Sequence, residues 1–165
     1  MRNGETILAT VHGSHLYGLA TPDSDVDLFR VVYGPGKTKQ RTEGGFDVVT
    51  VPLDRFLTNV FNGSHQSCEA LFSPRKYVHP DFEVFFRAQV VTGEDAFARY
   101  RRTIRAFSYG TAKQRRHSMR LGYNLKSLRE EGRFNPVMTD GQITMATATS
   151  ELYWGASLTD IAINL

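Results

Sequence analysis

The first half of the chain alternates short β-prone runs with segments of helical periodicity. Runs of β-branched and aromatic residues at 7–11, 25–33, 46–50 and 76–78 predict four strands, because each run is bounded by turn-forming residues. Short helices are expected at 14–18 and 66–72. After Pro52, apolar residues recur at helical spacing as far as Asn62-Gly63, which predicts a longer helix. The segment between the second and third runs is rich in Lys, Thr and Gly and is interpreted as a polar loop.

From Pro80 onward the hydrophobic pattern is helical. We predict helices over 81–91, 95–107 and 111–131, with a break at Gly110 and an end at Gly132. The tail, 143–163, is also interpreted as helical. Because the composition shifts near residue 92, the chain is expected to comprise an α/β (α+β) core over 1–92 and a helical segment over 93–165.

Composition narrows the class of protein. With 165 residues, of which 41% are apolar and 22% charged, the chain has the size of one globular domain or two small ones. No apolar run approaches the roughly 20 residues that cross a bilayer, and no secretory segment follows Met1, so we expect a cytoplasmic protein without a membrane partner. Cys68, the single cysteine, cannot form an internal disulfide or a Cys-based zinc site, which agrees with a reducing compartment.

Charge is distributed unevenly along the chain. Residues 1–95 carry 9 Lys and Arg against 12 Asp and Glu, whereas residues 96–165 carry 11 against 5. Carboxylates hold cations and basic side chains hold phosphates, so this division suits a metal-dependent enzyme that acts on a polyanion. The alternative is a helical second half with solvated basic faces.

The most informative stretch combines a Gly-Ser turn with two closely spaced carboxylates. It reads Val11-His12-Gly13-Ser14, then ten residues, then Asp25-Val26-Asp27-Leu28. Since side chains alternate along a strand, Asp25 and Asp27 should share one face. Two neighbouring carboxylates repel each other unless a divalent cation or a shared proton neutralises them, and Mg²⁺ prefers carboxylate oxygens.

The Gly-Ser turn supplies a site for an anion. Glycine lets the backbone approach a ligand closely, and amides at the start of a short helix point toward an anion. A triphosphate could therefore lie between Gly13-Ser14 and cations on Asp25 and Asp27. The alternative is an ordinary turn followed by an exposed strand face.

This pattern resembles the signature of the DNA polymerase β-like nucleotidyltransferase superfamily. Residues 12–28 are most similar to the predicted nucleotidyltransferases that accompany RNA ligases and occur in many phages. Looser similarities lie at Leu53-Asp54-Arg55-Phe56-Leu57, Glu69-Ala70-Leu71-Phe72 and a later helix with Lys113, His117 and Arg120. The resemblance implies a minimal nucleotidyltransferase core with a mixed, mainly antiparallel sheet, and a C-terminal helical segment that covers the active-site cleft.

The resemblance also implies a reaction. It implies two-metal transfer of a nucleoside monophosphate from an NTP, such as ATP, to a hydroxyl, with Mg²⁺ or Mn²⁺ and release of pyrophosphate. Asp47 is the third carboxylate expected at the metal site, beside Asp25 and Asp27, while Gly13 and Ser14 hold phosphates. The alternative for Asp47 is a surface carboxylate on an edge strand.

The predicted helix at 111–131 carries a polar stripe. Lys113, His117, Arg120 and Asn124 fall on one side of it, beside a stripe of leucines. Lys113 and Arg120 could neutralise phosphate charge, and His117 could form a hydrogen bond to a phosphate or to the acceptor. The alternative is a stripe that is exposed to solvent and binds nothing. Other basic residues suit an RNA groove or a solvated face equally, with no aromatic platform clearly interleaved: Arg99, Arg101, Arg102, Arg105, Arg115 and Arg116.

Three functions remain open at this stage. The acceptor of an active enzyme could be an RNA or tRNA end. It could instead be a protein hydroxyl, as for some small nucleotidyltransferases of toxin–antitoxin pairs. The third possibility is an inactive module that binds nucleotide or nucleic acid. The sequence does not select the NTP or the oligomeric state.

Overall fold

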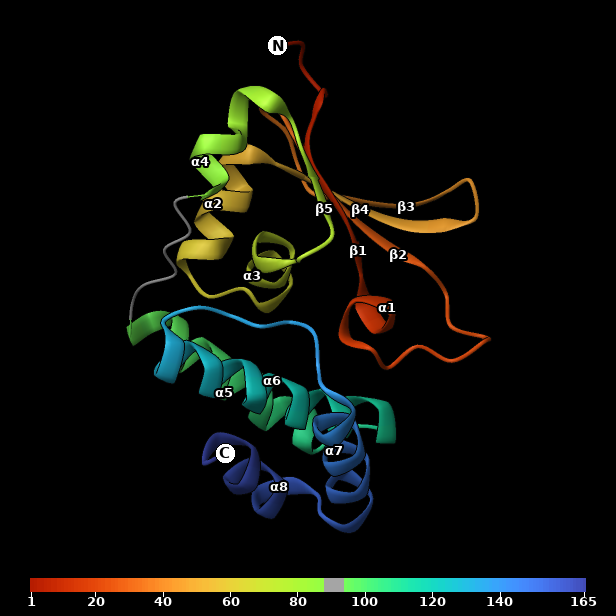
Figure 1. The fold of residues 1–165 in the computed structure, drawn as a ribbon, viewed down its shortest axis with the longest axis vertical. Helices are drawn as coiled ribbons and strands as arrows, with labels where there is room; N and C mark the ends of the chain where they lie inside the picture. Colours follow the sequence, from red (N-terminus) through yellow and green to blue (C-terminus); the bar gives the residue numbers. More distant parts are fainter. Residues whose placement is uncertain (88–93) are drawn as a thin grey trace.

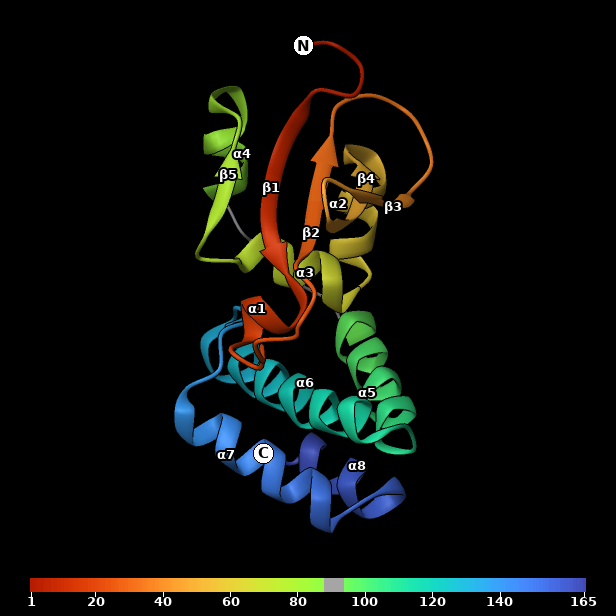
Figure 2. The same ribbon diagram turned by 90° about the vertical axis from the view of Figure 1, so that its right-hand side faces the viewer.

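The computed structural model describes residues 1–87 and 94–165 and contains a five-stranded sheet with helices beside and below it (Figures 1 and 2). The strands are β1 (Thr6–His12), β2 (Asp27–Val32), β3 (Lys39–Glu43), β4 (Phe46–Pro52) and β5 (Lys76–Val78). The helices are α1 (Gly13–Tyr17), α2 (Leu53–Phe61), α3 (His65–Phe72), the 3₁₀ turn η1 (Pro80–Phe82), α4 (Glu83–Arg87), α5 (Glu94–Ser108), α6 (Ala112–Glu131), α7 (Asp140–Leu152) and α8 (Gly155–Ile163).

The strand order is β3-β4-β2-β1-β5, and the sheet is mixed. Only β2 and β4 run parallel among the described strands; the other three pairings are antiparallel, which confirms the predicted mainly antiparallel sheet. The register places Asp27 opposite Asp47 across the parallel pair and opposite His12 across β1 and β2. Polar side chains therefore lie together on one face of the sheet, at one end of these strands.

Helices α2, α3 and α4 lie against one face of the sheet (Figures 1 and 2). Alternate strand residues point into this layer, and Leu8, Phe29 and Val31 are buried there with Phe56 of α2. The opposite face carries polar pairs instead: the Arg30 guanidinium donates to Thr50 Oγ1 and lies 3.2 Å from a Glu43 oxygen.

Helices α5 to α8 lie below the end of the sheet, with α6 next to the other three (Figure 1). The α6 helix begins with a Thr111 capping box and ends at Gly132 in the left-handed conformation. The core continues between the two halves: Phe134, after α6, contacts the rings of Phe72 in α3 and Tyr100 in α5. This shared core holds α6 in a defined place beneath the sheet.

The sequence predicts most elements, with four differences. Strand β3 lies in the segment predicted to be a polar loop; its five residues are exposed, and main-chain pairing with β4 identifies it as a strand. Strand β2 begins at Asp27 rather than residue 25. The tail forms two helices, separated at Tyr153 and Trp154. The predicted helix 81–91 is divided between η1 and α4 as far as it is described.

Residues 88–91 of that predicted helix, and the domain boundary predicted at residue 92, lie outside the described residues, so the division into 1–92 and 93–165 stays a prediction. Within the described ranges, no helix combines the length and apolarity that crossing a bilayer requires.

Candidate active site

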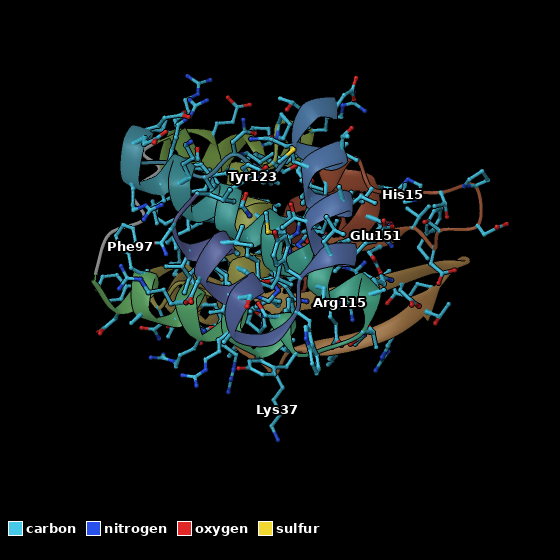
Figure 3. All side chains as sticks on the ribbon, turned by 90° about the horizontal axis from the view of Figure 1, so that it is seen from below. His15, Lys37, Phe97, Arg115, Tyr123 and Glu151 are labelled. Atoms are coloured by element: carbon cyan, nitrogen blue, oxygen red, sulfur yellow. The ribbon has the colours of Figure 1, made fainter. Side chains whose placement is uncertain are left out.

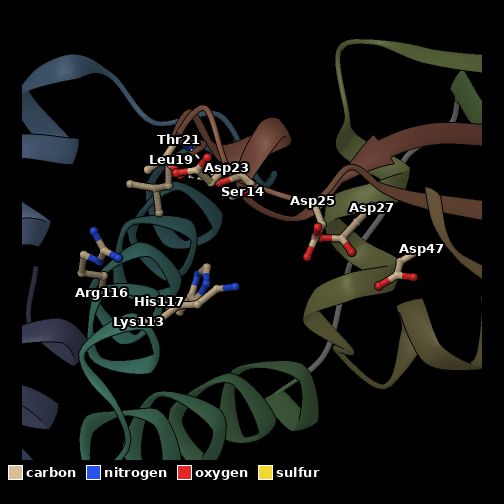
Figure 4. A pocket seen from close by; sticks show the side chains of 11 residues that line it. Ser14, Leu19, Thr21, Asp23, Asp25, Asp27, Asp47, Lys113, Arg116 and His117 are labelled. Atoms are coloured by element: carbon tan, nitrogen blue, oxygen red, sulfur yellow. Dashed lines mark hydrogen bonds between the residues drawn. The ribbon is translucent and has the colours of Figure 1, made fainter. Parts of the chain in front are cut away.

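The acidic wall of the candidate site is built from β2, β4 and the loop before β2. Asp27 opens β2 and pairs in register with Asp47 of β4, whose amide donates to the Val26 carbonyl at 3.2 Å. Asp25 precedes the strand by two residues. All three carboxylates line one cleft of about 430 Å³ (Figure 4). Strand register thus brings Asp27 and Asp47 to one cleft, and the loop before β2 adds Asp25, which was expected to share the strand face with Asp27.

The three carboxylates share the cleft without forming a closed ligand cluster. Asp47 accepts a hydrogen bond from Thr42 Oγ1 at 2.9 Å. Within residues 1–87 and 94–165, none of the three forms an ion pair, and no group of three or more His, Cys, Asp or Glu side chains is gathered closely enough to hold a metal ion. Negative charge at this edge of the sheet is therefore not compensated by a basic partner in contact.

The Gly13-Ser14 turn lies directly against the acidic wall. Gly13 has a φ of +64°, and a Cβ atom built on it would lie 2.0 Å from Asp27 Oδ2. Only glycine combines this backbone conformation with this approach to the carboxylate. Ser14 follows in α1 and lines the cleft.

The basic wall comes from the first two turns of α6. Lys113 and His117 of the predicted stripe line the cleft opposite the carboxylates (Figure 4). Arg116 joins them, although the sequence analysis grouped it with the general basic residues. Its position three residues after Lys113, on the same helical face, is the signal that could have identified it.

Arg120 has a different environment from the one predicted. Its side chain is 2% exposed, and its guanidinium forms an ion pair with Glu69, which is completely buried. The same group stacks on the Tyr17 ring at 3.7 Å. Arg120 lines the hollow that adjoins the cleft, but its charge is paired with Glu69 and is not that of a free cation.

Glu69, in α3, is the centre of a buried polar network. Its carboxylate accepts hydrogen bonds from Tyr17 Oη at 2.5 Å and Asn124 Nδ2 at 3.4 Å, and it lies 3.4 Å from His12 Nε2. Burial by itself raises the pKa of Glu69, but the Arg120 charge and the His12 contact outweigh it and hold the pKa well below its usual range. Glu69 belongs to a segment with a loose family similarity but was not predicted as a site residue. The further signal for it is that it is the one acid in the apolar stretch 68–72 of α3.

His117 links this network to the cleft. Arg120 Nε donates to His117 Nδ1 at 3.2 Å. Burial, followed by the Arg120 charge, lowers the pKa of His117 to about 3. The imidazole is therefore neutral near pH 7, and because Nδ1 is an acceptor, its proton resides on Nε2.

The cleft continues past Lys113 and His117 into an adjoining hollow of about 360 Å³. The two share Ser14, Asp27, Lys113 and His117. Further lining residues come from β3, α3 and the last turn of α5, namely Gln40, His65, Gln66 and Phe107. There is space on both sides of the basic wall for a ligand larger than a single phosphate.

Comparison with known proteins agrees with this geometry. A search of curated proteins finds no match to this chain. The family model of the nucleotidyltransferase domain matches residues 2–86, which is slightly more than half of the chain and includes the Gly-Ser turn, all three carboxylates and Glu69. The chain therefore belongs to the nucleotidyltransferase domain family, in the polymerase β-like superfamily.

Proposed function

We propose that the protein transfers a nucleoside monophosphate from an NTP to a hydroxyl group of a second substrate. The observation that carries this proposal is the in-register pairing of Asp27 with Asp47 at a cleft whose opposite wall holds Lys113, Arg116 and His117. An acidic wall facing a basic wall can hold a triphosphate and neutralise the charge that develops as pyrophosphate leaves.

The residues present suit a divalent cation. Asp25, Asp27 and Asp47 offer hard oxygen donors, and no basic group in contact neutralises them within the described residues. As they stand, the three carboxylates are not gathered closely enough to enclose an ion by themselves. We propose that they would hold Mg²⁺ or Mn²⁺ together with the substrate, because these ions keep several waters and complete their shell with substrate phosphate oxygens. When bound, such ions would lower the pKa of the acceptor hydroxyl and stabilise the departing pyrophosphate.

The remaining roles follow from the position of each side chain. The Ser14 hydroxyl and the Lys113 and Arg116 cations line the cleft and would bind phosphate oxygens. Neutral His117 would donate its Nε2 proton to a phosphate oxygen or to the acceptor. Arg120, which was predicted to bind phosphate, is assigned a positioning role instead, because it holds His117 Nδ1 from within the buried network.

The reaction exchanges one phosphorus–oxygen bond for another. The acceptor oxygen forms a bond to the α-phosphorus as the bond between that phosphorus and the pyrophosphate oxygen breaks. Asp47 Oδ1 accepts the hydrogen bond from Thr42. The other carboxylate oxygen of Asp47 is available to take the proton of the acceptor hydroxyl. An RNA end is the acceptor that we favour, because residues 96–165 carry the chain's basic excess.

Labelling with NTPs tests the proposal. Each of the four α-labelled NTPs is incubated with Mn²⁺ or Mg²⁺ and either total RNA or RNA-depleted lysate protein. Label is expected in RNA, and Asp27→Asn should reduce it by about a hundredfold or more. Asp54→Asn, which removes one exposed carboxylate of α2, is the matched control and should label normally.

The two main outcomes separate the alternatives. Label in protein instead of RNA would replace the RNA acceptor with a protein hydroxyl. Absence of label from every fraction, with wild type equal to Asp27→Asn, would contradict catalysis. Thermal unfolding with Mn²⁺ adds a second readout: saturation at about a hundredfold excess over the dissociation constant should stabilise the wild type by about 2.7 kcal/mol, and Asp27→Asn should lose most of this gain.

A further inference from the structure

A separate hollow of about 410 Å³ lies between α5 and α8. It is lined by Arg101, Arg102, Arg105, Tyr109, Ala156, Thr159, Asp160 and Ile163, none of which lines the active-site cleft. The proposed transfer reaction assigns no role to these residues. The hollow is therefore a candidate second binding surface, which we call the α5–α8 surface.

Positive charge dominates the α5–α8 surface. Arg101, Arg102 and Arg105 are exposed on α5, and none of them forms an ion pair among the side chains of residues 1–87 and 95–165. Asp160 is the one acidic residue among those that line the hollow. Three guanidinium groups without acidic partners repel one another, and a polyanion would relieve this repulsion.

Two neighbouring arginines are not counted in this surface, because their guanidinium groups donate hydrogen bonds to main-chain carbonyl oxygens. Arg115 donates to the Ser150 and Gly110 carbonyls at 3.0 and 3.1 Å, and it lies where α6 passes α7 (Figure 3). Arg99 donates to the Asn62 carbonyl at 3.5 Å. The free arginines are thus a specific subset of those that the sequence analysis grouped together.

Exposed aromatic rings flank the arginines. Tyr109, at the end of α5, is 57% exposed, and Trp154, immediately before α8, is 73% exposed. A Cβ atom on Gly155 would lie 3.1 Å from Tyr109 Cε1, so the tyrosine ring rests against the backbone next to Trp154. The fold therefore brings two exposed rings from segments far apart in the sequence near each other, and Tyr109 lines the hollow. We call these two rings the aromatic platform. Large exposed aromatic rings are suited to stacking on unpaired bases.

We propose that the α5–α8 surface binds single-stranded nucleic acid, with phosphates on Arg101, Arg102 and Arg105 and bases stacked on Tyr109 and Trp154. Unpaired bases are required, since the bases of a duplex are already stacked on each other. Tyr109 precedes Lys113 of the cleft by four residues, which span at most about 14 Å. The claim that this surface binds the acceptor rests on the proposed function. The claim that it binds single-stranded nucleic acid does not.

Fluorescence anisotropy without NTP or metal tests the binding. The probes are a labelled single strand of about 12 nucleotides as RNA and as DNA, with the matching duplex and polyphosphate as competitors. Arg102→Gln/Arg105→Gln should weaken single-strand binding about tenfold or more and reduce the salt dependence. Trp154→Ala should weaken it about tenfold with the salt dependence unchanged.

The charge-matched control is Arg129→Gln/Arg133→Gln, at the opposite end of α6, which should bind like the wild type. Two results would overturn the inference. One is equal loss in the control and in Arg102→Gln/Arg105→Gln. The other is a Trp154→Ala variant that binds normally but dissociates a dimer of the wild-type chain, since the aromatic platform would then be an interface between copies.

Asp27→Asn separates this inference from the proposed function. It should bind the single strand like the wild type, because Asp27 lies outside the α5–α8 surface. Normal binding with no nucleotide transfer by the wild type would contradict the proposed function alone. If the wild type transfers nucleotide to RNA and the arginine and tryptophan variants bind the single strand as tightly as the wild type, only the inference about the α5–α8 surface is contradicted.

Discussion

Glu69 and Arg120 form an ion pair that is shielded from solvent beneath the active-site cleft, with 0% and 2% of their side chains exposed. The pair joins α3, within residues 2–86 that match the family model, to α6, which lies beyond them. Through Arg120 Nε it also fixes the acceptor nitrogen of His117. One buried contact therefore sets both the docking of α6 and the protonation of a residue on the cleft wall.

Breaking this pair should be strongly destabilising. Arg120→Met leaves the Glu69 carboxylate buried without its cation, which we expect to lower the free energy of unfolding by about 3–5 kcal/mol. The double variant Glu69→Gln/Arg120→Met removes both charges and should recover part of this loss. Urea unfolding measures both values. Arg87→Met, which removes an exposed pair with Glu83, should change stability by about 0.5 kcal/mol or less; an equally small effect of Arg120→Met would contradict the prediction.

Stability should decrease on mild acidification. Burial lowers the pKa of His65 to about 4 and that of His117 to about 3, whereas histidines in the unfolded chain titrate near about 6.5. Between these values the unfolded chain binds more protons, so stability is complete above about pH 6.5 and is lost as the pH falls toward about 4. Glu69, with its lowered pKa, adds a further loss below its ordinary pKa.

Urea midpoints across this pH range check that prediction. His65→Gln should flatten the decline, because one of the two imidazoles with a lowered pKa is removed. His15→Gln, which replaces an exposed histidine, should keep the wild-type dependence. A wild-type midpoint that stays constant from about pH 7.5 to about pH 5 would show that neither imidazole is protonated more readily in the unfolded chain.

Local spacing and the family resemblance together directed attention to one wall of the site and part of the other. The spacing of Gly13-Ser14 from Asp25 and Asp27 is visible in the sequence, whereas Asp47 was expected from the resemblance. Strand alternation does not place Asp25, because β2 begins at Asp27. Helical spacing likewise identified Lys113 and His117. Helical spacing indicated that Arg120 lies on the same side of the helix as these residues, but it did not indicate that the side chain is buried. The burial of Arg120 depends on its ion pair with Glu69, which is distant in the chain. Strand β3 was missed for a related reason: its pairing with β4 leaves no apolar signal in its own residues.

Gly13→Ala should damage the site more than the fold. The methyl group would lie 2.0 Å from Asp27 Oδ2, so the carboxylate must move, and the backbone φ of +64° adds strain of about 1–2 kcal/mol. Displacement of Asp27 should reduce nucleotide transfer about a hundredfold. Gly44→Ala introduces a similar strain at φ +58° with no neighbour closer than 4.0 Å. The two variants should therefore lose comparable stability in thermal unfolding, and equal transfer rates would show that Asp27 tolerates the displacement.

Gly122→Ala should test how closely α6 and α8 pack. A Cβ atom at Gly122 would lie 2.3 Å from the Ala162 carbonyl oxygen, so the helices must separate locally. We expect a loss of about 1–3 kcal/mol from overpacking, which exceeds the gain of up to about 1 kcal/mol from replacing a helical glycine. Gly141→Ala in α7 has only Thr139 Oγ1 at 4.0 Å and should be neutral or slightly stabilising. In urea unfolding, Gly122→Ala should therefore lower the free energy of unfolding, whereas Gly141→Ala should raise it slightly or leave it unchanged. If both were equally stable, α8 would have to move away from α6 at little cost, and the α5–α8 surface would not be held in a fixed shape.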